Sequence, residues 1–444
     1  MHRIELQISR YICLVKRSYL LILLLSSVTA FSQDEEYVND KQLRYEDYTY
    51  KSNIKTVQLY ESSWEFSPPL IEFNSGQQLQ LSFDDLDLDK KQYSFSVIHC
   101  DAKWNPSDLM VSEYIQGYFD MNIINWSFSV NTLQKYAHYS ILFPQSGMTI
   151  TKSGNYVLYV YQNGDKENLV LTRRFMVFQN KVFVGATTRQ AVGNDEQYTK
   201  QHIDFNIQAS GYDLTNPFTD LKVVLTQNNR WDNAIYDIKP TFTTLNQLTY
   251  SLDDASTFNG GSEFRYFDIR SLRTYTERIQ NIYKDSLSKY HVELTNDESR
   301  YLKNYVFYND LNGGFLLKNQ DTQGNQDIEN DYAWVHFFMF NTDVQPGGNF
   351  YVLGKLTNWK LDKANRMTYN YKRLGYECSL YLKQGYYNYI FAFLPDKTKA
   401  GDETLVEGNH WETENDYTIY VYHRQRATYY DQLIAVRKFN SVKK

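Results

Sequence analysis

Residues 93–117, YSFSVIHCDAKWNPSDLMVSEYIQG, form the stretch on which the fold prediction rests. Alternate side chains from Tyr93 to His99 face one way and those between them face the other, which predicts a strand. Turn-forming residues follow around Trp104, and Pro106 excludes a continuing central strand. Aromatic loops on sheets often bind partners or cover a sheet end. We therefore predict that Trp104 and Pro106 contact a partner or lock the loop.

Short strand patterns separated by turn signals recur through the chain of 444 residues. With 40 Tyr and 26 Phe against 8 Pro, the composition also favours strands. The spacing predicts an all-β fold of tandem β-sandwich domains of the immunoglobulin-like or early-set kind. The predicted divisions are a signal peptide at 1–32, a first sandwich at 33–180, a second at 181–328, a third at 329–426 and a tail at 427–444.

Within these blocks the strand predictions are specific. Residues 272–282 also fit one face of a helix, but the β context favours strands there. The predicted strands are 54–60, 78–83, 93–99, 126–130, 138–143, 156–161 and 169–178 in the first block, 203–207, 221–227, 235–238, 248–252, 264–269, 289–294 and 305–308 in the second, and 333–340, 350–354, 378–382, 386–393 and 417–423 in the third.

The N-terminus predicts export. Four basic residues precede a short apolar core, Leu20 to Leu25, and Ala30-Phe31-Ser32 fits a cleavage site between Ser32 and Gln33. A membrane anchor would need about 20 apolar residues, and this core is far shorter. The formal net charge of −6 becomes −9 once the +3 of residues 1–32 is removed. An acidic exported chain argues against nucleic acid or an anionic membrane surface as the partner.

The sequence predicts no catalytic, cofactor or metal site. His99, Cys100 and Asp101 are adjacent, but neighbouring strand residues face opposite ways, so a strand end is favoured over a metal cluster. The acidic run from Asp84 to Asp89 lacks the glycine and terminal Glu of a calcium loop, which favours a solvated hairpin turn. No nucleophile elbow, phosphate loop or dinucleotide fingerprint occurs. After export two cysteines remain, Cys100 and Cys378, and we predict buried free thiols.

The third block resembles the early-set, starch-binding-like domain found beside glycogen-active enzymes. The matching stretches are FYVLGKLTNWKLDKANRM at 350–367 and YECSLYLKQGYYNYIFAFLP at 376–395. Asn358-Trp359 matches the Asn-Trp of that domain, but Ile390 stands where the resemblance implies a basic residue. A second sugar-facing Trp is also missing from the following loop. Trp359 is therefore predicted to be a vestigial sugar-site position with a mainly structural role.

The first block resembles the first domain of the type IX secretion system Plug protein of Bacteroidetes, in order through residues 54–179. The matching stretches are HCDAKWNPSDLMVSEYIQG, NWSFSVNTLQKYAHYSILFP, TKSGNYVLYVY and LVLTRRFMVF. The resemblance implies a periplasmic, non-enzymatic protein attached peripherally to the inner side of the outer membrane. Its implied partner is the giant outer-membrane translocon barrel of the SprA/Sov type. The plug would close the periplasmic end of that barrel when no substrate is loaded.

Two alternatives remain open from the sequence. Asn358-Trp359 and its sandwich would also suit an exported carbohydrate-binding module. A glycan-cleaving enzyme is less favoured, because its only support is the presence of exported β-domains with many carboxylates. Neither nucleic acid nor direct insertion into a membrane is expected for any of these functions.

Overall fold

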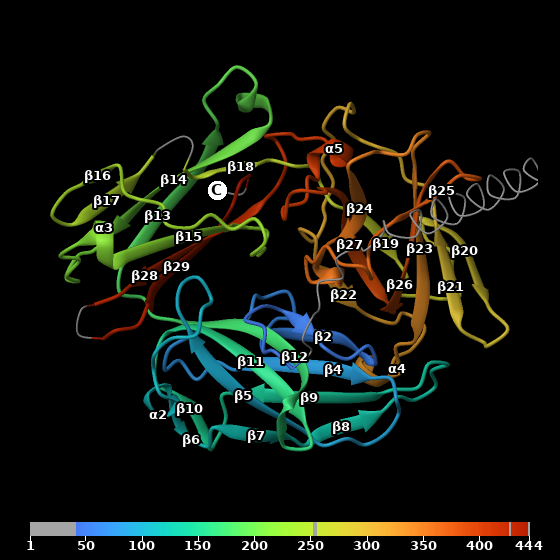
Figure 1. Cartoon of the computed structure of the whole chain (residues 1–444), viewed down its shortest axis with the longest axis horizontal. Coiled ribbons are helices and arrows are strands. Elements are labelled where there is room, and N and C mark those ends of the chain that lie inside the picture. The colour runs from blue at the N-terminus through green and yellow to red at the C-terminus, as the bar shows by residue number, and fades with distance from the viewer. Residues whose placement is uncertain (1–40, 252–254, 426–427, 443–444) are drawn as a thin grey trace, which may run out of the picture. The chain divides into compact units, whose positions relative to one another are not determined.

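The computed structural model describes residues 41–251, 255–425 and 428–442 (Figure 1). The predicted signal peptide, with cleavage between Ser32 and Gln33, lies outside these residues. From Leu43 onward the chain forms one compact unit. Its regular structure is almost entirely strands arranged in several sheets, which confirms the all-β prediction. No helix in the described part of the chain is long and apolar enough to cross a membrane.

Lobe 1, which we define as residues 43–179, contains two main sheets. One has the strand order β1-β12-β11-β5-β7, with β3 parallel to β12, and the other has the order β2-β4-β9-β8. Strands β6 and β10 form a separate pair. The strands are β1 (Tyr48–Thr49), β2 (Ile54–Glu61), β3 (Leu70–Glu72), β4 (Leu79–Asp85), β5 (Tyr93–Cys100), β6 (Ile115–Gly117), β7 (Asp120–Ile123), β8 (Asn125–Phe128), β9 (Ala137–Phe143), β10 (Met148–Ile150), β11 (Gly154–Gln162) and β12 (Asp165–Phe178).

The core of lobe 1 lies between its two main sheets. Tyr93, Phe95 and Val97, which the alternation places on one face of β5, are all buried in this core. The Tyr93 ring meets the rings of Phe83 and Tyr139 edge to face, with centroids 5.2 Å and 4.8 Å apart. Aromatic pairs of this geometry add to the energy of simple burial. Side-chain alternation therefore located both the strand and its inward face.

Lobe 2 comprises residues 181–259 together with 413–442. Its two sheets have the orders β13-β14-β17-β16, with β18 beside β14, and β15-β28-β29 (Figure 1). The strands are β13 (Phe183–Gln190), β14 (Lys200–Gln208), β15 (Leu221–Gln227), β16 (Phe242–Thr243), β17 (Gln247–Tyr250), β18 (Thr257–Asn259), β28 (Asp416–His423) and β29 (Gln432–Asn440).

Pairing of the last two strands differs from the predicted domain divisions. The strand expected at 417–423 in the third sandwich pairs with β15 instead, with Leu225 opposite Ile419. The residues expected to form a tail from 427 onward contain β29, whose Leu433 and Ile434 are fully buried. The physical reason is the apolar alternation of β28, whose inward side chains complete the core of lobe 2.

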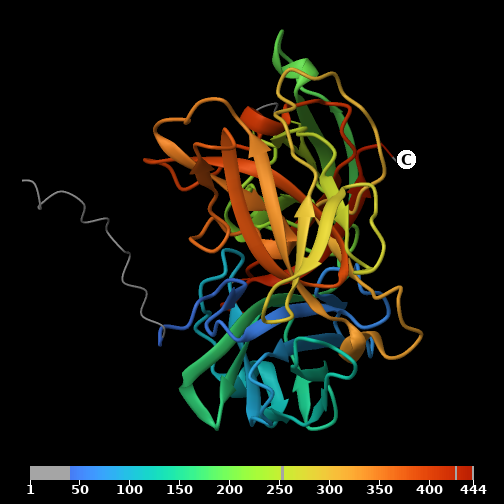
Figure 2. The ribbon, with the colours of Figure 1, turned by 90° about the vertical axis from the view of Figure 1, so that its right-hand side faces the viewer.

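Lobe 3 comprises residues 264–411 and is inserted between β18 and β28 of lobe 2. One sheet is β19-β27-β22, with β24 also paired to β27, and the other is β20-β21-β23-β26-β25 (Figure 2). The strands are β19 (Arg265–Asp268), β20 (Ile279–Lys284), β21 (Tyr290–Leu294), β22 (Phe315–Leu317), β23 (Tyr332–Phe340), β24 (Gly348–Leu353), β25 (Thr368–Asn370), β26 (Gly375–Lys383) and β27 (Gly385–Pro395).

The predicted division at residue 328 therefore does not match the strand pairing. Strands β19 and β21 were expected in the second sandwich, but β19 pairs with β27 and β21 runs parallel to β23. Val292 and Leu294 of β21 pack in one core with Val335 and Phe337 of β23, so burial assigns them to lobe 3. Parallel pairing brings together strands separated by a long connection, which local patterns do not reveal.

Local predictions failed at a few positions. Residues 235–238 make only an isolated bridge between Ile235 and Leu225, and residues 305–308 form no strand. In the segment where a helical face was the alternative, strand β20 begins at Ile279, so the preference for strands is correct from there on, and residues 272–278 are neither strand nor helix. The helices within the described residues are single turns, α2 (Val111–Tyr114), α3 (Pro217–Asp220), α4 (Gln326–Glu329) and α5 (Thr404–Glu407), and 3-10 turns occur at Glu196–Tyr198 and Lys355–Thr357.

Candidate functional site

Trp104 lies where lobe 1 meets lobe 2. Its side chain is 2% exposed and its backbone φ is +69°. The ring meets Trp231 edge to face at a centroid distance of 4.9 Å, and the Arg174 guanidinium lies 4.5 Å from its centroid. The indole N–H has no hydrogen-bond partner among the described residues, so packing and the cation–π contact provide its stabilisation. We propose that Trp104 locks the loop and joins the two lobes.

Pro106 remains exposed on the same loop. Its backbone bridges to Cys100, and the Ser107 N–H donates to the carbonyl of His99 at 2.9 Å. The His99 imidazole contacts the Ser107 hydroxyl at 2.9 Å and is fully buried, and burial lowers the pKa of His99 to about 4. The loop therefore closes over the end of β5, and Pro106 is the one of the two predicted residues that a partner could reach.

Polar contacts reinforce the junction of lobes 1 and 2. The buried Asp431 carboxylate accepts the Ala102 N–H at 2.9 Å and pairs with the Lys222 ammonium at 2.8 Å. The Tyr422 hydroxyl donates to the Asn155 side-chain carbonyl at 2.8 Å, with both groups buried. Buried polar groups that find partners across a junction fix the register of the two surfaces.

Asp84 joins lobe 1 to lobe 3. Its carboxylate lies 2.7 Å from the Lys383 ammonium, accepts the Tyr332 hydroxyl at 2.6 Å and contacts His138 Nδ1 at 2.7 Å. Burial alone would raise the pKa of Asp84, but the Lys383 ammonium and the His138 hydrogen bond outweigh it and hold that pKa below its ordinary value. A buried carboxylate with three partners is ionised and positioned, and removing one partner leaves an uncompensated charge.

The acidic run was predicted to be a solvated turn, and this is wrong for its first two residues. Asp84 and Asp85 are buried, and only the tip beyond residue 86 is exposed. The Asp85 carboxylate pairs with the Lys91 ammonium at 2.9 Å and accepts the Tyr93 hydroxyl at 2.8 Å. The charges were visible in the sequence, but their partners lie on other strands, so burial could not be predicted from the run itself.

Asp331 makes a second contact between lobes 1 and 3. Its carboxylate accepts the backbone N–H groups of Leu133 and Gln134, the latter at 2.9 Å. Nearby, the Tyr136 hydroxyl donates to the Asn330 carbonyl at 2.9 Å. These charge-assisted bonds hold a loop of lobe 1 against the start of β23.

Trp359 lies at the junction of lobes 2 and 3 and is half-buried. The Arg230 guanidinium of lobe 2 lies 4.5 Å from its ring centroid, and Phe264 packs against it at 5.8 Å. A side chain at Gly313 would meet the Trp359 ring at 2.3 Å, so the ring needs that glycine. Ile390 is buried in the same small cluster. With its ring occupied by protein groups, we propose a structural role for Trp359.

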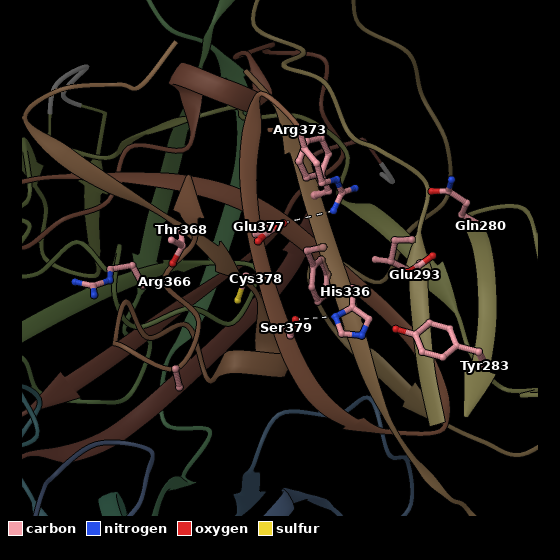
Figure 3. A pocket seen from close by; sticks show the side chains of 14 residues that line it. Gln280, Tyr283, Glu293, His336, Arg366, Thr368, Arg373, Glu377, Cys378 and Ser379 are labelled. Atoms are coloured by element: carbon pink, nitrogen blue, oxygen red, sulfur yellow. Dashed lines mark hydrogen bonds and ion pairs between the residues drawn. The ribbon is translucent and has the colours of Figure 1, made fainter. Parts of the chain in front are cut away.

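A pocket that the sequence did not predict lies on the five-stranded sheet of lobe 3 (Figure 3). Its volume is about 770 Å³, within the range typical of ligand sites. Tyr283 from β20, Glu293 from β21, His336 from β23 and Ser379 from β26 all line it. Regular alternation places these side chains on the face of the sheet opposite the core.

Two histidines meet beside this pocket, although no histidine pair stood out in the sequence. His291 Nδ1 lies 2.9 Å from His336 Nε2. His291 Nε2 is 3.3 Å from the Asp285 carboxylate, and His336 Nδ1 is 2.7 Å from the Ser379 hydroxyl. The parallel pairing of β21 and β23 brings them together across 45 positions of sequence.

Other chemistry is sparse in the part of the chain that the structure describes. No group of three or more His, Cys, Asp or Glu side chains there could hold a metal ion. Cys100 and Cys378 are free and buried, as predicted. Burial raises the pKa of the Cys100 thiol to about 12 and that of the Cys378 thiol to about 11, which makes both poor nucleophiles.

Three β-sandwich lobes joined by buried aromatic and ionic contacts define a class of all-β protein with several lobes, and comparisons identify its family. Residues 54–179 match the family model described as Type 9 secretion system plug protein 1st domain. A hypothetical protein from Parabacteroides merdae, known from its crystal structure, is 32% identical with a TM-score of 0.86, over 90% of this chain and 100% of that one. The chain belongs to the type IX secretion system plug family.

Two other comparisons add little. The collagen adhesin of S. aureus matches with 9% identity over 88% of this chain and 91% of that one, and its TM-score of 0.10 supports no structural argument. The comparison with curated proteins gives no match. The protein is thus a type IX secretion-associated plug protein on the strength of the family match of its first lobe.

Proposed function

We propose that this protein is a non-enzymatic plug that closes the periplasmic end of the type IX outer-membrane translocon barrel when no substrate is loaded. The observation that supports this most is the family match of lobe 1, residues 54–179. A large barrel leaves a wide aqueous lumen that must be sealed at rest. The predicted signal peptide would bring the chain to the periplasm, where it would attach peripherally to the inner side of the outer membrane.

Rigid joining of the lobes suits a body that must block an opening. The buried Asp84–Lys383 pair and the packing of Trp104 against Trp231 hold lobe 1 to the other two lobes. A plug that bent freely at these junctions would leak. The contacts therefore support a single blocking body in preference to a flexible string of modules.

Lobe 1 also offers a surface for the barrel. Between strands β6 and β8, Tyr118 and Ile124 are exposed by 72% and 76%, and Phe119 is also exposed, as is Phe128 at the end of β8. Exposed aromatic and aliphatic residues that lie close together in sequence on a family-matched lobe are candidates for partner contact. Such a contact, set on an acidic and mainly polar surface, could release when a substrate arrives.

A permeability experiment tests the proposal. Deletion of the gene should admit large antibiotics that the intact outer membrane excludes, because the barrel would stand open. Deletion of both this gene and the barrel gene should restore exclusion, and a plasmid copy of this gene should do so in the single deletion strain. A single deletion strain as impermeable as wild type would contradict the plug function.

Surface variants refine the same experiment. Replacing Tyr118 and Ile124 together with Ser should reduce co-purification of the barrel and reproduce the leak, with the folded structure kept. The matched control is Tyr371, which is exposed by 76% in lobe 3, outside the family match. Tyr371→Ser should leave both readouts unchanged.

A further inference from the structure

The pocket on lobe 3 is polar and balanced in charge. Two carboxylates, Glu293 and Glu377, and two guanidiniums, Arg366 and Arg373, line it. Arg373 is already engaged, since it pairs with Glu377 at 3.5 Å and lies 3.9 Å from the Phe338 ring centroid. A pocket with equal numbers of opposite charges favours neither an anion nor a cation. Its polar lining also argues against an apolar ligand.

One side of the pocket carries an aromatic face. Tyr283 is 40% exposed and its ring is nearly parallel to that of His291, at a centroid distance of 5.0 Å and an interplanar angle of 12°. Figure 3 labels Tyr283 on β20, Glu293 on β21 and His336 on β23, and the His291 ring of β21 contacts both Tyr283 and His336. An aromatic face next to hydrogen-bonding side chains offers both stacking and polar contacts.

A chain of hydrogen bonds runs beside this pocket from Asp285 through the two histidines to Ser379, and its last two members, His336 and Ser379, line the pocket. The rings of His291 and His336 have centroids 5.1 Å apart and planes that differ by 9°. Because their nitrogens are 2.9 Å apart on the line between the centroids, the two rings lie edge to edge in nearly one plane. This is the geometry of a well-aligned N–H···N hydrogen bond.

The groups at the two ends of this chain of hydrogen bonds determine which partner donates in each bond. Hydrogen bonds from backbone N–H groups, first that of Lys289, hold the pKa of Asp285 below its ordinary value, so Asp285 is an acceptor. Burial and the neighbouring His291 lower the pKa of His336, which favours its neutral form, with one N–H donor and one acceptor nitrogen. We assign the tautomers in which His291 Nε2–H donates to Asp285 and His336 Nε2–H donates to His291 Nδ1. His336 Nδ1 accepts the Ser379 hydroxyl hydrogen.

This direction fixes what Ser379 presents to the pocket. Its hydrogen is committed to His336, and its free lone pair is left for a donor. Ser379 is exposed and sits at the pocket lining, where an incoming hydroxyl or amide N–H could donate to it. The groups that face the pair from the packed elements are Asp285, Glu293, Glu377 and Arg373.

We propose that this face of lobe 3 binds a neutral oligosaccharide, which stacks on Tyr283 and donates a hydrogen bond to Ser379. The charge balance, the polar lining and the aromatic face together suit a hydroxyl-rich ligand. Asp285 and His291 are positioning residues, since they act through His336. The site is separate from Trp359, whose ring is occupied by Arg230. It is also independent of the barrel contact proposed for lobe 1.

Calorimetric titration of the chain lacking residues 1–32 tests the site, with chitohexaose and maltohexaose as probes. At least one should bind with a Kd below 1 mM, and Ser379→Ala and Tyr283→Ala should each weaken that binding about fivefold to tenfold. Tyr371→Ala, an exposed aromatic outside the pocket lining, is the control and should change nothing. If neither sugar binds, or if both variants bind sugar as tightly as wild type, the proposal is wrong.

A neutral Gly-Ser decapeptide serves as the competing probe. Binding of this peptide without binding of either sugar would overturn the proposal in favour of a polypeptide ligand. Retained sugar binding in a plug variant that no longer holds the barrel, such as the Tyr118 and Ile124 double variant, would show that the two functions are separate.

The variant Asp285→Asn tests the direction of the chain of hydrogen bonds and leaves the residues that line the pocket unchanged. An Asn amide can donate to His291 Nε2, which would reverse every bond and leave His336 with its hydrogen on Nδ1. Nitrogen-15 spectra of the imidazoles should show His336 protonated on Nε2 in wild type and on Nδ1 in the variant at pH 7.5. Sugar affinity should fall severalfold in step with that change. An unchanged tautomer together with unchanged affinity would contradict the positioning role.

Discussion

Asp84 and Lys383 form an ion pair at 2.7 Å with both side chains almost fully buried, at 1% and 2% exposure. The two residues are 299 positions apart and belong to different lobes. Burial removes both charges from water, so the pair stabilises the junction only while both partners and the Tyr332 hydroxyl are present. The carboxylate that was predicted from the sequence to lie in a solvated turn is therefore one of the groups that hold lobe 1 against lobe 3.

Replacing Asp84 with Asn should destabilise the protein strongly. The substitution leaves the Lys383 ammonium buried without a counter-charge, which typically costs about 3–5 kcal/mol in the free energy of unfolding. Urea denaturation followed by fluorescence would measure the loss. The double variant Asp84→Leu with Lys383→Met should recover part of it, because no lone charge is then buried.

Asp87→Asn is the matched control for that experiment. Asp87 belongs to the same acidic run and also pairs with a lysine, Lys91, but its side chain is 53% exposed. An exposed pair contributes about 0–1 kcal/mol, so this variant should be almost as stable as wild type. Equal losses for Asp84→Asn and Asp87→Asn would show that burial does not decide the effect.

Acidification should weaken the same junction. The pKa of Asp84 is lower in the folded protein than its ordinary value, chiefly because Lys383 and His138 offset the effect of burial. Such a group contributes stability that is present above the unfolded pKa of 3.8 and is lost as the pH falls through the folded pKa. Wild type should therefore lose more stability than Asp84→Asn between pH 5 and pH 3, in matched urea titrations.

Asp310 should give the opposite dependence at higher pH. Burial, together with Glu263 and Glu414, raises the pKa of Asp310 to about 7 although the N–H groups of Phe264 and Asn312 oppose the shift. A raised folded pKa means that its stabilising contribution is complete below pH 3.8 and disappears as the pH rises through about 7.

Asp310→Asn should remove this pH dependence. Between pH 5 and pH 8, wild type should lose stability relative to the variant, which keeps an acceptor for the backbone donors but does not titrate. The comparison of the two proteins cancels the contribution of every other titratable group, because both proteins contain them. A stability difference that stays constant from pH 5 to pH 8 would contradict the raised pKa.

Substitution of Trp104 tests whether packing joins lobe 1 to lobe 2. Trp104→Ala should lower the free energy of unfolding by about 3–5 kcal/mol, as for other buried large aromatic residues. Trp104→Phe should cost less, because the indole N–H makes no hydrogen bond that would be lost and a ring still faces Arg174. Thermal unfolding of both variants measures the effect, and an Ala variant as stable as wild type would refute the buried role.

The sequence predicted local structure well because side-chain alternation is a local property. Strand β15 matches its predicted bounds, Leu221 to Gln227, and the inward face of β5 was read from every second residue. The resemblance of residues 99–117 and their neighbours to the plug family is confirmed by the family match. These inferences needed no knowledge of which strands pair.

Long-range pairing explains what the sequence did not reveal. Leu225 and Ile419 face each other across nearly two hundred residues, and only their shared burial places β28 in lobe 2. His291 and His336 meet through a parallel pair, so their spacing in sequence resembles no ligand motif. Asp84 and Lys383 likewise form an ion pair only because lobes 1 and 3 are in contact. The prediction that there is no metal site was based on the spacing of ligand residues along the sequence. That spacing cannot reveal residues that come together only in the folded structure.

Substitution of Trp359 distinguishes a structural role for this aromatic residue from a role in sugar binding. Arg230 lies 4.5 Å from the ring centroid and itself pairs with Glu403 at 2.9 Å, so the ring is held between lobes. Trp359→Ala should lower the melting temperature, since it empties a packed cluster and unpairs the cation from its ring. Gly313→Ala should do the same, because the added Cβ would meet the Trp359 ring at 2.3 Å. Differential scanning calorimetry measures both variants.

Neither variant should change sugar affinity at the pocket beside Tyr283, because Trp359 and Gly313 do not line it. Titration with chitohexaose and maltohexaose below the melting temperature of each variant provides the comparison. Affinity that disappears in Trp359→Ala while Tyr283→Ala binds normally would move the sugar site to Trp359 and make the protein a carbohydrate-binding module of the starch-binding kind. Unchanged affinity with a lowered melting temperature is the expected result, because the contacts of Trp359 are made within the protein.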